Sequence, residues 1–441
     1  MSQHDFNIAN QGFPAFRADL NNALAALVSN SSGATAPSTT FAHQFWLDTS
    51  ASPSVFKMRN SDNDAWVDIC SIDQSTDKVT VLNATQIKVG GVVYTLPTSD
   101  GTNGQALKTN GSGVLAFGNA GDSAYGLFRK ADPTIVAWTK TGNFTVSTAT
   151  TLYVEVNGEL KTIASSTAVT MPGSATTGTD YAIWAKTDGT LEATSNHTTP
   201  PTANARKVGG FHYAPGGNAT GTSGGNTTAQ INEYSFWDLK FRPACPDPRG
   251  MTLVGGGFWS DIYLTGVDAI TNGSSKYNVT MADGSSPPKV PTMFGGNGST
   301  TYGSFTWFEA MELATAFGKK CPTQMEFMSL AYGTTEASSI GSDQVSTVLN
   351  AAYTSKWGVI QASGVLYVWA RDRGGPAAAA SWNANTEGRG SEYNAPNAGR
   401  LGGNWDDGAN SGSRCSLWSS AASNSSHNIG SRFVCDHLQL D

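Results

Sequence analysis

Apolar residues near the start of the chain recur at helical spacing. Within residues 14–30, the positions that follow the 3.6-residue period are Phe16, Leu20, Ala23, Leu24 and Leu27. This pattern predicts an amphipathic helix. It leaves open what covers the apolar face, because the helix could pack on its own domain or dock on another chain.

After this helix the pattern changes to the two-residue period of β-strands. The clearest hairpin signal is LYVEVNGEL, in which three apolar residues alternate with polar ones before an Asn157-Gly158 turn. The segment YAIWAKTDGTLEA repeats this arrangement around Asp188-Gly189. We therefore predict a β-sandwich over residues 123–235.

Between about Val79 and Asn119, short β-branched runs such as VVYTL alternate with turns rich in Gly, Asn and Ser. Strands with so few apolar residues cannot close a core alone, and intertwining of three chains is a natural solution. We predict a fibre-like or β-prism-like linker over residues 76–122. A small N-terminal domain over residues 1–75 precedes it.

Strong helical signals return only in the last part of the chain. Thr306 and Glu309 fit a capping box, and Gly318 offers a C-terminal stop. A second capping box at Thr323 and Glu326 predicts another short helix that ends near Gly333. Strands rich in Gly and Trp follow this pair. We predict an α+β domain over residues 236–441.

Residues 400–438 interleave two populations. Those that we call the framework residues are Gly402, Gly403, Trp405, Ser411, Gly412, Ser413, Arg414, Trp418, Gly430, Arg432 and residues 434–438. Between them lie mostly small polar residues that no hydrophobic period explains. Glycines and tryptophans at fixed places indicate a packed, tightly turned backbone. Replaceable residues between them are typical of a binding face on a rigid scaffold.

This stretch resembles the major tropism determinants of bacteriophages, as do GGFHYAPGGN (209–218), GGNTTAQINEYSFWDLKFRP (224–243), DPRGMTLVGGGFW (247–259) and YTSKWGV (353–359). The resemblance covers roughly residues 123–441. It implies a trimeric receptor-binding protein at the tip of a tail fibre, with a C-type-lectin-like C-terminal domain diversified by a retroelement that rewrites adenines. Residues 1–122 do not fit that family's N-terminal prism domain and look like the start of an ordinary phage tail fibre.

The family's variable positions, aligned without gaps, fall on twelve residues that we call the display positions. They are Asn404, Asp406, Asp407, Gly408, Asn410, Leu417, Ser419, Ser420, Asn424, Ser426, Asn428 and Ile429. Adenine mutagenesis of AAC-like codons reaches Asn, Asp, Ser, Gly, Leu and Ile, but never Trp, Met, Gln, Lys or Glu. All of the display positions hold reachable types. This agreement supports the assignment without deciding it, because the excluded types are a minority of any sequence.

The resemblance also implies the assembly and the partners. We expect a mainly β, intertwined homotrimer in which residues 1–75 attach to the phage tail or baseplate. The C-terminal domain is expected to bind a bacterial cell-surface receptor, either protein or glycan. The protein would be made in the host bacterial cytoplasm and then reside in the virion tail fibre.

Charge and cysteine content narrow the function classes. A net charge of −7 without a basic cluster argues against nucleic-acid binding. No apolar run is long enough to span a bilayer, and MSQHDFNIAN lacks the features of a signal peptide, so we expect no membrane insertion. Five scattered cysteines without a CxxC motif predict buried free thiols rather than a disulfide framework or a zinc site.

No catalytic constellation stands out. The helix pair also resembles formylglycine-generating enzymes, but Cys415 lacks the close cysteine partner that those enzymes need. Asp406 and Asp407 lack the second half of a calcium-lectin site, and His427 and His437 lack a nucleophile partner. The aromatic residues of VLYVWARDRGG (365–375) are expected in the core rather than on a sugar-stacking platform.

We therefore expect no enzymatic activity, no metal and no cofactor. Two alternatives to a tropism determinant stay open. One is a structural tail-fibre protein without a diversified site, and the other is a glycan-binding or glycan-processing protein.

Overall fold

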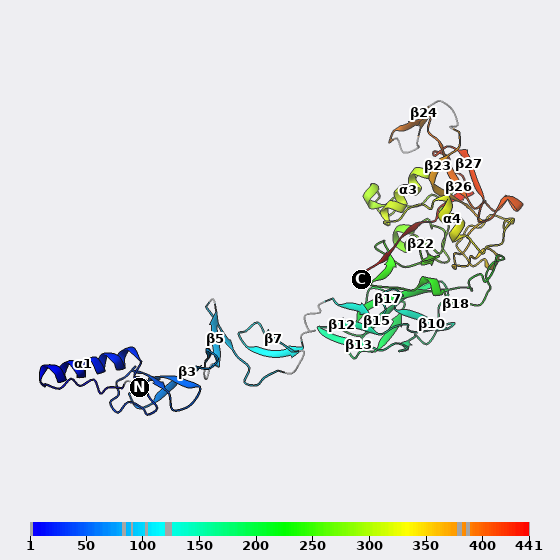
Figure 1. The fold of residues 1–441 in the computed structure, drawn as a ribbon. Coiled ribbons are helices and arrows are strands. Elements are labelled where there is room, and N and C mark those ends of the chain that lie inside the picture. The colour runs from blue at the N-terminus through cyan, green and yellow to red at the C-terminus, as the bar shows by residue number, and fades with distance from the viewer. Residues whose placement is uncertain are drawn as a thin grey trace. The chain divides into compact units, whose positions relative to one another are not determined.

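A computed structural model describes residues 3–81, 85–89, 91–101, 105–119, 126–376, 382–384 and 389–440. The chain is mainly β and divides into two compact units, residues 1–120 and residues 121–441 (Figure 1). Among the described residues, no helix is both long enough and apolar enough to cross a membrane.

The first unit begins with the predicted helix, α1 (Phe13–Val28), which has Pro14 in its first turn. A four-stranded antiparallel sheet follows in the order β1 (Phe45–Asp48), β2 (Ser54–Arg59), β3 (Trp66–Asp73), β4 (Lys78–Val81). Two separate hairpins complete the unit: β5 (Gln86–Val89) with β6 (Val92–Thr95), and β7 (Gln105–Thr109) with β8 (Leu115–Asn119).

The first unit leaves much of its apolar surface uncovered. In α1, Ala23 and Ala26 are buried, whereas Leu20 and Leu24 are 38% and 50% exposed. Most of the large apolar side chains exposed in the described chain belong to this unit, among them Ile87, Val93 and Phe117. The hydrophobic core clusters found in the described residues all lie in the second unit. Within the described residues, Ala23 of the predicted stripe is therefore covered, whereas Phe16, Leu20, Leu24 and Leu27 stay exposed.

The second unit opens with three sheets around one core. Their strands are β9 (Phe128–Lys130), β10 (Trp138–Gly142), β11 (Thr145–Thr148), β12 (Leu152–Val156), β13 (Glu159–Ile163), β14 (Val169–Thr170), β15 (Thr179–Ala185), β16 (Leu191–Thr194), β17 (Arg206–Ala214), β18 (Gln230–Ile231) and β19 (Trp237–Asp238). The sheet orders are β13-β12-β9, β10-β11 and β14-β16-β15-β17-β18, with β19 also on β17. The Asn157-Gly158 hairpin is confirmed, because Val156 pairs with Glu159. Trp138, Leu152 and Phe211 pack in the shared core.

The rest of the second unit carries both predicted capping boxes. The helices are α2 (Ala269–Asn272), α3 (Trp307–Ala316) and α4 (Gln324–Leu330), and the single 3₁₀ turns are η2 (Glu233–Ser235), η3 (Thr292–Phe294), η4 (Ala351–Tyr353) and η5 (Gly408–Asn410). Thr306 with Glu309 caps α3, and Thr323 with Glu326 caps α4. Helix α4 ends before the predicted Gly333.

Two four-stranded sheets and a hairpin complete the chain. One sheet has the order β20 (Phe241–Pro243), β29 (Val434–Gln439), β22 (Phe258–Asp261), β21 (Met251–Val254). The other has the order β27 (Ser416–Ser420), β26 (Asn397–Leu401), β23 (Tyr367–Gly374), β28 (Ile429–Gly430). The hairpin of β24 (Trp382–Ala384) and β25 (Ser391–Tyr393) extends from β23 and β26 (Figure 1). The display positions lie in and around β27 and β28.

Candidate functional site

A buried arginine holds the base of the final stretch. Arg432 is 0% exposed, and its guanidinium donates hydrogen bonds to four backbone carbonyls. The acceptors are the oxygens of Asp261 at 2.9 Å, Ile262 at 2.6 Å, Ile360 at 2.6 Å and Gln361 at 3.0 Å. Arg432 thereby joins the end of β22 and the 360–361 loop to the last strands, which confirms it as a framework residue.

Close backbone approaches shape the first display loop, residues 402–415. Gly403 has φ +79°, and a Cβ there would lie 2.3 Å from Ser411 Oγ, so a side chain does not fit. The amide of Ser413 donates to Glu336 Oε2 at 2.9 Å. Ser339 Oγ donates to the carbonyl of Trp405 at 2.9 Å and accepts from the amide of Gly408 at 3.0 Å. The loop is therefore attached to the preceding 336–339 segment.

Trp418 in β27 packs against Gly399 in β26, where the absence of a side chain leaves room for its ring. A Cβ at Gly399 would approach its ring to 2.8 Å, and its indole nitrogen donates to Ser416 Oγ at 3.1 Å. Asn397 Nδ2 donates to the carbonyl of Trp418 at 3.0 Å. These contacts fix the strand from which Leu417, Ser419 and Ser420 extend.

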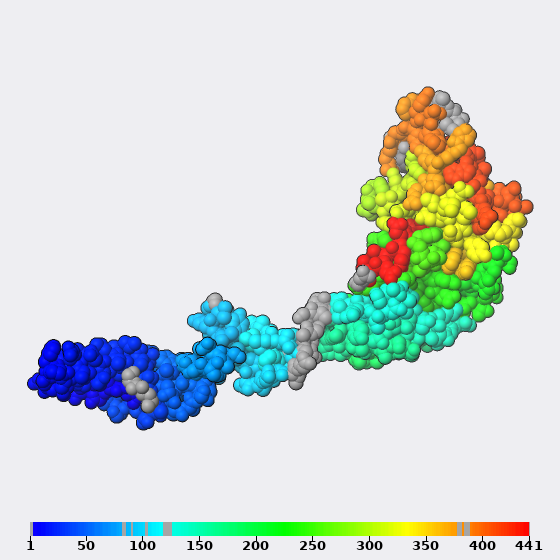
Figure 2. All heavy atoms as spheres, viewed as in Figure 1, coloured from blue at the N-terminus to red at the C-terminus, as the bar shows by residue number. Residues whose placement is uncertain are grey.

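The display positions differ in exposure. Asp406, Gly408, Asn410 and Ser419 are exposed, and Asp407, Leu417, Asn424, Ser426 and Asn428 are half-buried. Asn404, Ser420 and Ile429 are buried, at 5%, 7% and 0% exposure. These three side chains therefore do not reach the surface of the single chain, and the receptor-binding role of the display positions stays a prediction. Figure 2 shows other parts of this orange-red stretch at the surface of the second unit.

Fixed aromatic residues connect the two display loops, 402–415 and 421–428. The rings of Trp405 and His427 lie 6.0 Å apart between their centroids. The Tyr367 amide donates to the carbonyl of Asn428 at 3.0 Å, and its hydroxyl lies near the carboxylate of Asp407. The guanidinium of Arg400 lies 5.0 Å from the centre of the Tyr367 ring. The same cluster of side chains therefore contacts both display loops.

Burial controls the electrostatics of this cluster. Burial, reinforced by the hydrogen bond to Asp407, raises the pKa of Tyr367 well above its usual value. Burial also lowers the pKa of Arg400, although the nearby Tyr367 and Asp407 oppose that change. Tyr367 is 6% exposed and Trp369 is 0% exposed, which confirms that the aromatic residues of VLYVWARDRGG pack in the core.

Two display positions also shape their own loop. Asn404 Oδ1 accepts from the amide of Asp406 at 2.6 Å, and the amide of Asn404 donates to Asp407 Oδ2 at 2.7 Å. Such local bonds between side chain and backbone are the contacts of an Asx turn. Asn404 and Asp407 therefore carry part of the loop conformation, which the alternation of residue types did not reveal.

Ile429 belongs to the interior. It packs in the cluster that contains Phe305, Leu313, Trp369 and Phe433. The sequence did not identify four supports of the display loops: Glu336, Ser339, Tyr367 and Arg400. These residues lie outside residues 402–428, and no local spacing links them to those loops.

The remaining candidate groups are separate from each other. His437 lies in β29, where its Nδ1 accepts a hydrogen bond from the Trp259 indole at 3.0 Å. His427 precedes β28, which belongs to a different sheet. In the part of the chain that the structure describes, no three metal-binding side chains form a group. All five cysteines are free thiols; Cys245, Cys321 and Cys435 are buried and Cys70 and Cys415 are half-buried.

Comparisons with known proteins find similar chains. A family model described as "Mtd second domain" matches residues 136–238. The "Tail fiber receptor-binding protein" of Bordetella phage BPP-1 is 53% identical over 326 residues, which cover 71% of this chain and 85% of that protein.

Two solved structures are also similar. The "Major Tropism Determinant U1 Variant" has a TM-score of 0.71 and 48% identity, and the match covers 84% of this chain and 95% of that one. The "Major Tropism Determinant P3c Variant" has a TM-score of 0.71 and 44% identity, over 91% of this chain and 96% of that one. These matches extend over more of the chain than residues 123–441, on which the resemblance was based. The chain belongs to the family of the phage major tropism determinants.

Proposed function

We propose that this chain is a phage tail-fibre receptor-binding protein that selects the bacterial host through the display loops. The similar protein of Bordetella phage BPP-1 is named for this role. The observation that carries the proposal to particular residues is the shared support of two loops. Tyr367 and Trp405 contact both segments that hold the display positions. Side chains on the two loops can therefore form one face, on what we assign as a C-type-lectin-like domain.

The proposed mechanism is binding without covalent chemistry. Arg432, Gly403 and Trp418 hold the backbone through contacts that do not involve the exposed display side chains. Exchange of Asp406, Asn410 or other exposed residues then alters the recognised surface while the backbone stays in place. We propose that the receptor is a protein or a glycan of the bacterial surface.

We further propose a homotrimer that attaches to the phage tail through residues 1–75. Support comes from the first unit, whose apolar stripe on α1 and whose hairpins β5–β6 and β7–β8 stay exposed in the single chain. Two further copies can cover this surface, because strands from three chains can close a common core.

A binding assay with paired variants tests the proposed face. The purified full-length chain is titrated onto cells of the bacterial strain that the phage infects. The variant Asp406→Ala/Asn410→Ala/Ser419→Ala changes only exposed display positions and should bind at least about tenfold more weakly, which corresponds to about 1.4 kcal/mol. The matched control is Ser174→Ala/Thr177→Ala/Thr187→Ala, at exposed positions near β15.

The control should bind within about twofold of the wild type, because those positions lie in the preceding three-sheet region. Equal binding by the display variant and the wild type would place the receptor site elsewhere. An equal loss in both variants would indicate a general defect rather than a local face.

A further inference from the structure

Two cysteines far apart in the sequence lie in one buried cluster, Cys245 just after β20 and Cys435 in β29. β20 and β29 pair antiparallel, with Arg242 opposite Leu438 and Pro243 opposite His437. The amide of Ala244 donates to Asp436 at 2.9 Å, which continues the ladder by one residue. Continued by one residue beyond β20, this register would place Cys245 opposite Cys435.

The hydrogen-bond pattern tells which kind of pair this is. The amides of Leu440 and Ala244 bond across to Lys240 and Asp436, so bonded and non-bonded pairs alternate along the ladder. Cys245 and Cys435 therefore fall at a non-hydrogen-bonded position. Opposed Cα atoms there are about 4.5 Å apart with their side chains close together. That separation lies within the range that a disulfide spans, about 4.4–6.8 Å.

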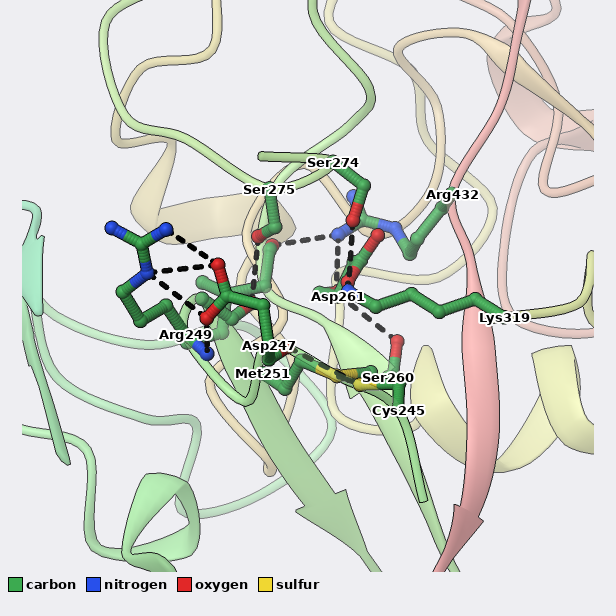
Figure 3. A network of polar contacts seen from close by, with 12 residues as sticks. Cys245, Asp247, Arg249, Met251, Ser260, Asp261, Ser274, Ser275, Lys319 and Arg432 are labelled. Carbon is green, nitrogen blue, oxygen red and sulfur yellow. Dashed lines mark hydrogen bonds and ion pairs between the residues drawn. The ribbon is translucent and has the colours of Figure 1, made fainter. Parts of the chain in front are cut away.

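The side chains are also close and face one another. Both cysteines are 3% exposed and belong to one cluster with Trp237, Met251 and Trp259. Cys245 Sγ lies 3.6 Å from Met251 Sδ (Figure 3). The two thiols also influence each other's pKa, as groups in one cluster do.

The two thiols are not equivalent. The hydrogen bond with Cys435 lowers the pKa of Cys245, burial opposes this, and the ammonium of Lys319 lowers it further. The pKa of Cys435 is raised by the hydrogen bond to Cys245 and by burial. Lys319 itself is held by Asp261 Oδ1 at 2.6 Å and Ser274 Oγ at 2.8 Å (Figure 3). The nearby ammonium of Lys319 favours thiolate formation at this pair.

A polar cavity lies near this pair. It holds about 90 Å³, enough for several water-sized molecules, and Asp247, Ser274 and Lys319 are among its lining residues. Asp247 is in direct contact with Cys245, because the thiol donates to its carbonyl at 3.2 Å. We infer that a small oxidant approaches the pair from this side.

We propose that Cys245 and Cys435 are a modification site, at which hydrogen peroxide converts the two thiols into a cross-strand disulfide. Cys245 sulfur attacks one peroxide oxygen, the O–O bond breaks, and the products are a sulfenic acid and one water. Cys435 sulfur then attacks Cys245 sulfur, the S–O bond breaks, and a second water leaves. The two thiols lose two electrons in total, and peroxide is reduced to two waters.

The bridge fastens the last strand of the chain. β29 would be joined covalently to the segment that follows β20, and the chain between Cys245 and Cys435, which contains all display positions, would become a closed loop. Closing so long a loop restricts the unfolded chain strongly. The closed form persists where thiol reductants are absent, as in the extracellular medium.

Peptide mapping of the full-length wild-type chain tests this proposal directly. The chain is incubated with peroxide, its free thiols are alkylated under denaturing conditions, and the peptides are weighed without reduction. We expect linked peptides that contain Cys245 and Cys435, lighter by two hydrogen atoms than the free pair. The melting temperature should rise by roughly 5 °C or more and return to its original value after dithiothreitol.

Two internal comparisons sharpen the test. Cys321 is 0% exposed, and burial raises the pKa of its thiol, so it should be alkylated fully after the same treatment. Cys435→Ser should give neither the linked peptides nor the rise in melting temperature. The proposal is overturned if both wild-type cysteines stay alkylatable, if Cys245 is oxidised while Cys435 stays free, or if either joins a different cysteine. The wild-type map decides alone, even if the variant does not fold.

Discussion

Arg432 is the single side chain on which the candidate face depends most. It is fully buried and donates to carbonyls of Asp261, Ile262, Ile360 and Gln361. One guanidinium thus donates to four carbonyl oxygens from two separate segments. Loss of the guanidinium removes a buried hydrogen bond from each of them. The oxygens of Asp261 and Ile262 keep a bond from Ser260 Oγ and from the Ile360 amide, whereas those of Ile360 and Gln361 depend on Arg432.

Replacement of Arg432 by methionine should destabilise the chain strongly. We expect Arg432→Met to lower the free energy of unfolding by about 3–5 kcal/mol, since breaking one side of a buried polar network costs about that much. Arg129→Met is the matched control, because Arg129 is exposed on β9 and such changes stay within about 0.5 kcal/mol. Chemical denaturation of both variants measures the difference. Similar midpoints for the two variants would contradict the anchoring role.

The display positions should not tolerate alanine equally. Asn404→Ala and Asp407→Ala each remove a side-chain bond that holds the loop, and we expect a loss of about 1–2 kcal/mol for each. Asp406→Ala and Asn410→Ala change exposed side chains and should stay within about 0.5 kcal/mol. Thermal unfolding of the four variants checks this. Indistinguishable melting temperatures would mean that loop shape does not depend on these bonds.

Sequence patterns predicted local features at the residue scale better than they predicted burial. The glycines, Trp418 and Arg432 stood out by type, and the structure confirms their packing. The burial of Ile429 could not be predicted from the interleaved pattern, because it depends on contacts with residues far along the chain, such as Phe305 and Trp369. Neither residue type nor spacing carries that information.

At the scale of elements, short-range features were predictable and long-range pairing was not. Helix α1, the two capping boxes and the Asn157-Gly158 hairpin depend on residues close in sequence. The order β20-β29-β22-β21 brings Phe241 beside Gln439, and periodicity cannot indicate which distant strand becomes a neighbour. The sheet that underlies the display loops was unpredictable for the same reason.

A buried polar chain joins strands of the second unit and should make its stability depend on pH. Asp180 Oδ1 lies 3.0 Å from His212 Nδ1 and accepts from the amide of Gly250 at 2.9 Å. His212 Nε2 lies 3.0 Å from the Tyr263 hydroxyl. Burial alone would raise the pKa of Asp180, but the charge and hydrogen bond of His212 outweigh it and lower that pKa below 3.8.

A carboxyl group with a lowered pKa stabilises the folded state fully above its ordinary pKa of 3.8. That contribution is lost as the pH falls through the lower pKa of the folded chain. The free energy of unfolding should therefore fall more steeply from about pH 5 to pH 2 in the wild type than in Asp180→Asn. Urea denaturation at stepped pH measures both slopes. Parallel slopes would show that the group does not titrate differently in the two states.

At the scale of the whole molecule, the two units differ in how they bury apolar surface. The second unit contains large clusters around Trp138, Trp369 and Trp259. The first unit exposes apolar residues on a helix and on two hairpins that only a single backbone bridge, Thr95 with Val114, is seen to join. The sequence indicated this already, because the strands of residues 76–122 carry few apolar residues each.

We therefore expect the full-length chain to be an obligate trimer. Light scattering of the purified protein at micromolar concentration should give three times the 46.1 kDa chain mass. As a control, Leu20→Lys/Leu24→Lys places charges on the exposed face of α1 and should reduce assembly. A folded monomer of the wild type at that concentration would exclude obligate assembly.

The linkage of several binding faces in one assembly should raise the apparent affinity for the receptor far above that of a single face. No display position holds Trp, Tyr or Arg, the residues that usually anchor interfaces. A single face should bind at about micromolar Kd, since each small polar group returns only about 0.5–1.5 kcal/mol. Linked faces can raise the apparent affinity by about 10²–10⁴. Residues 121–441 and the full-length chain are compared on the same bacterial cells, with circular dichroism to verify folding. Nanomolar binding by the shorter chain in monomeric form would contradict this expectation.

The buried position of Ile429 limits how many different faces this scaffold can show. Any process that exchanges the twelve display residues at random also places polar residues among Phe305, Leu313 and Phe433. Each such chain loses apolar packing and buries an unpaired polar group, at a cost of several kcal/mol against a total stability of about 5–15 kcal/mol. Many of the resulting chains would never fold. The usable repertoire is consequently smaller than the number of combinations, and selection for folding acts on the population before any receptor is met.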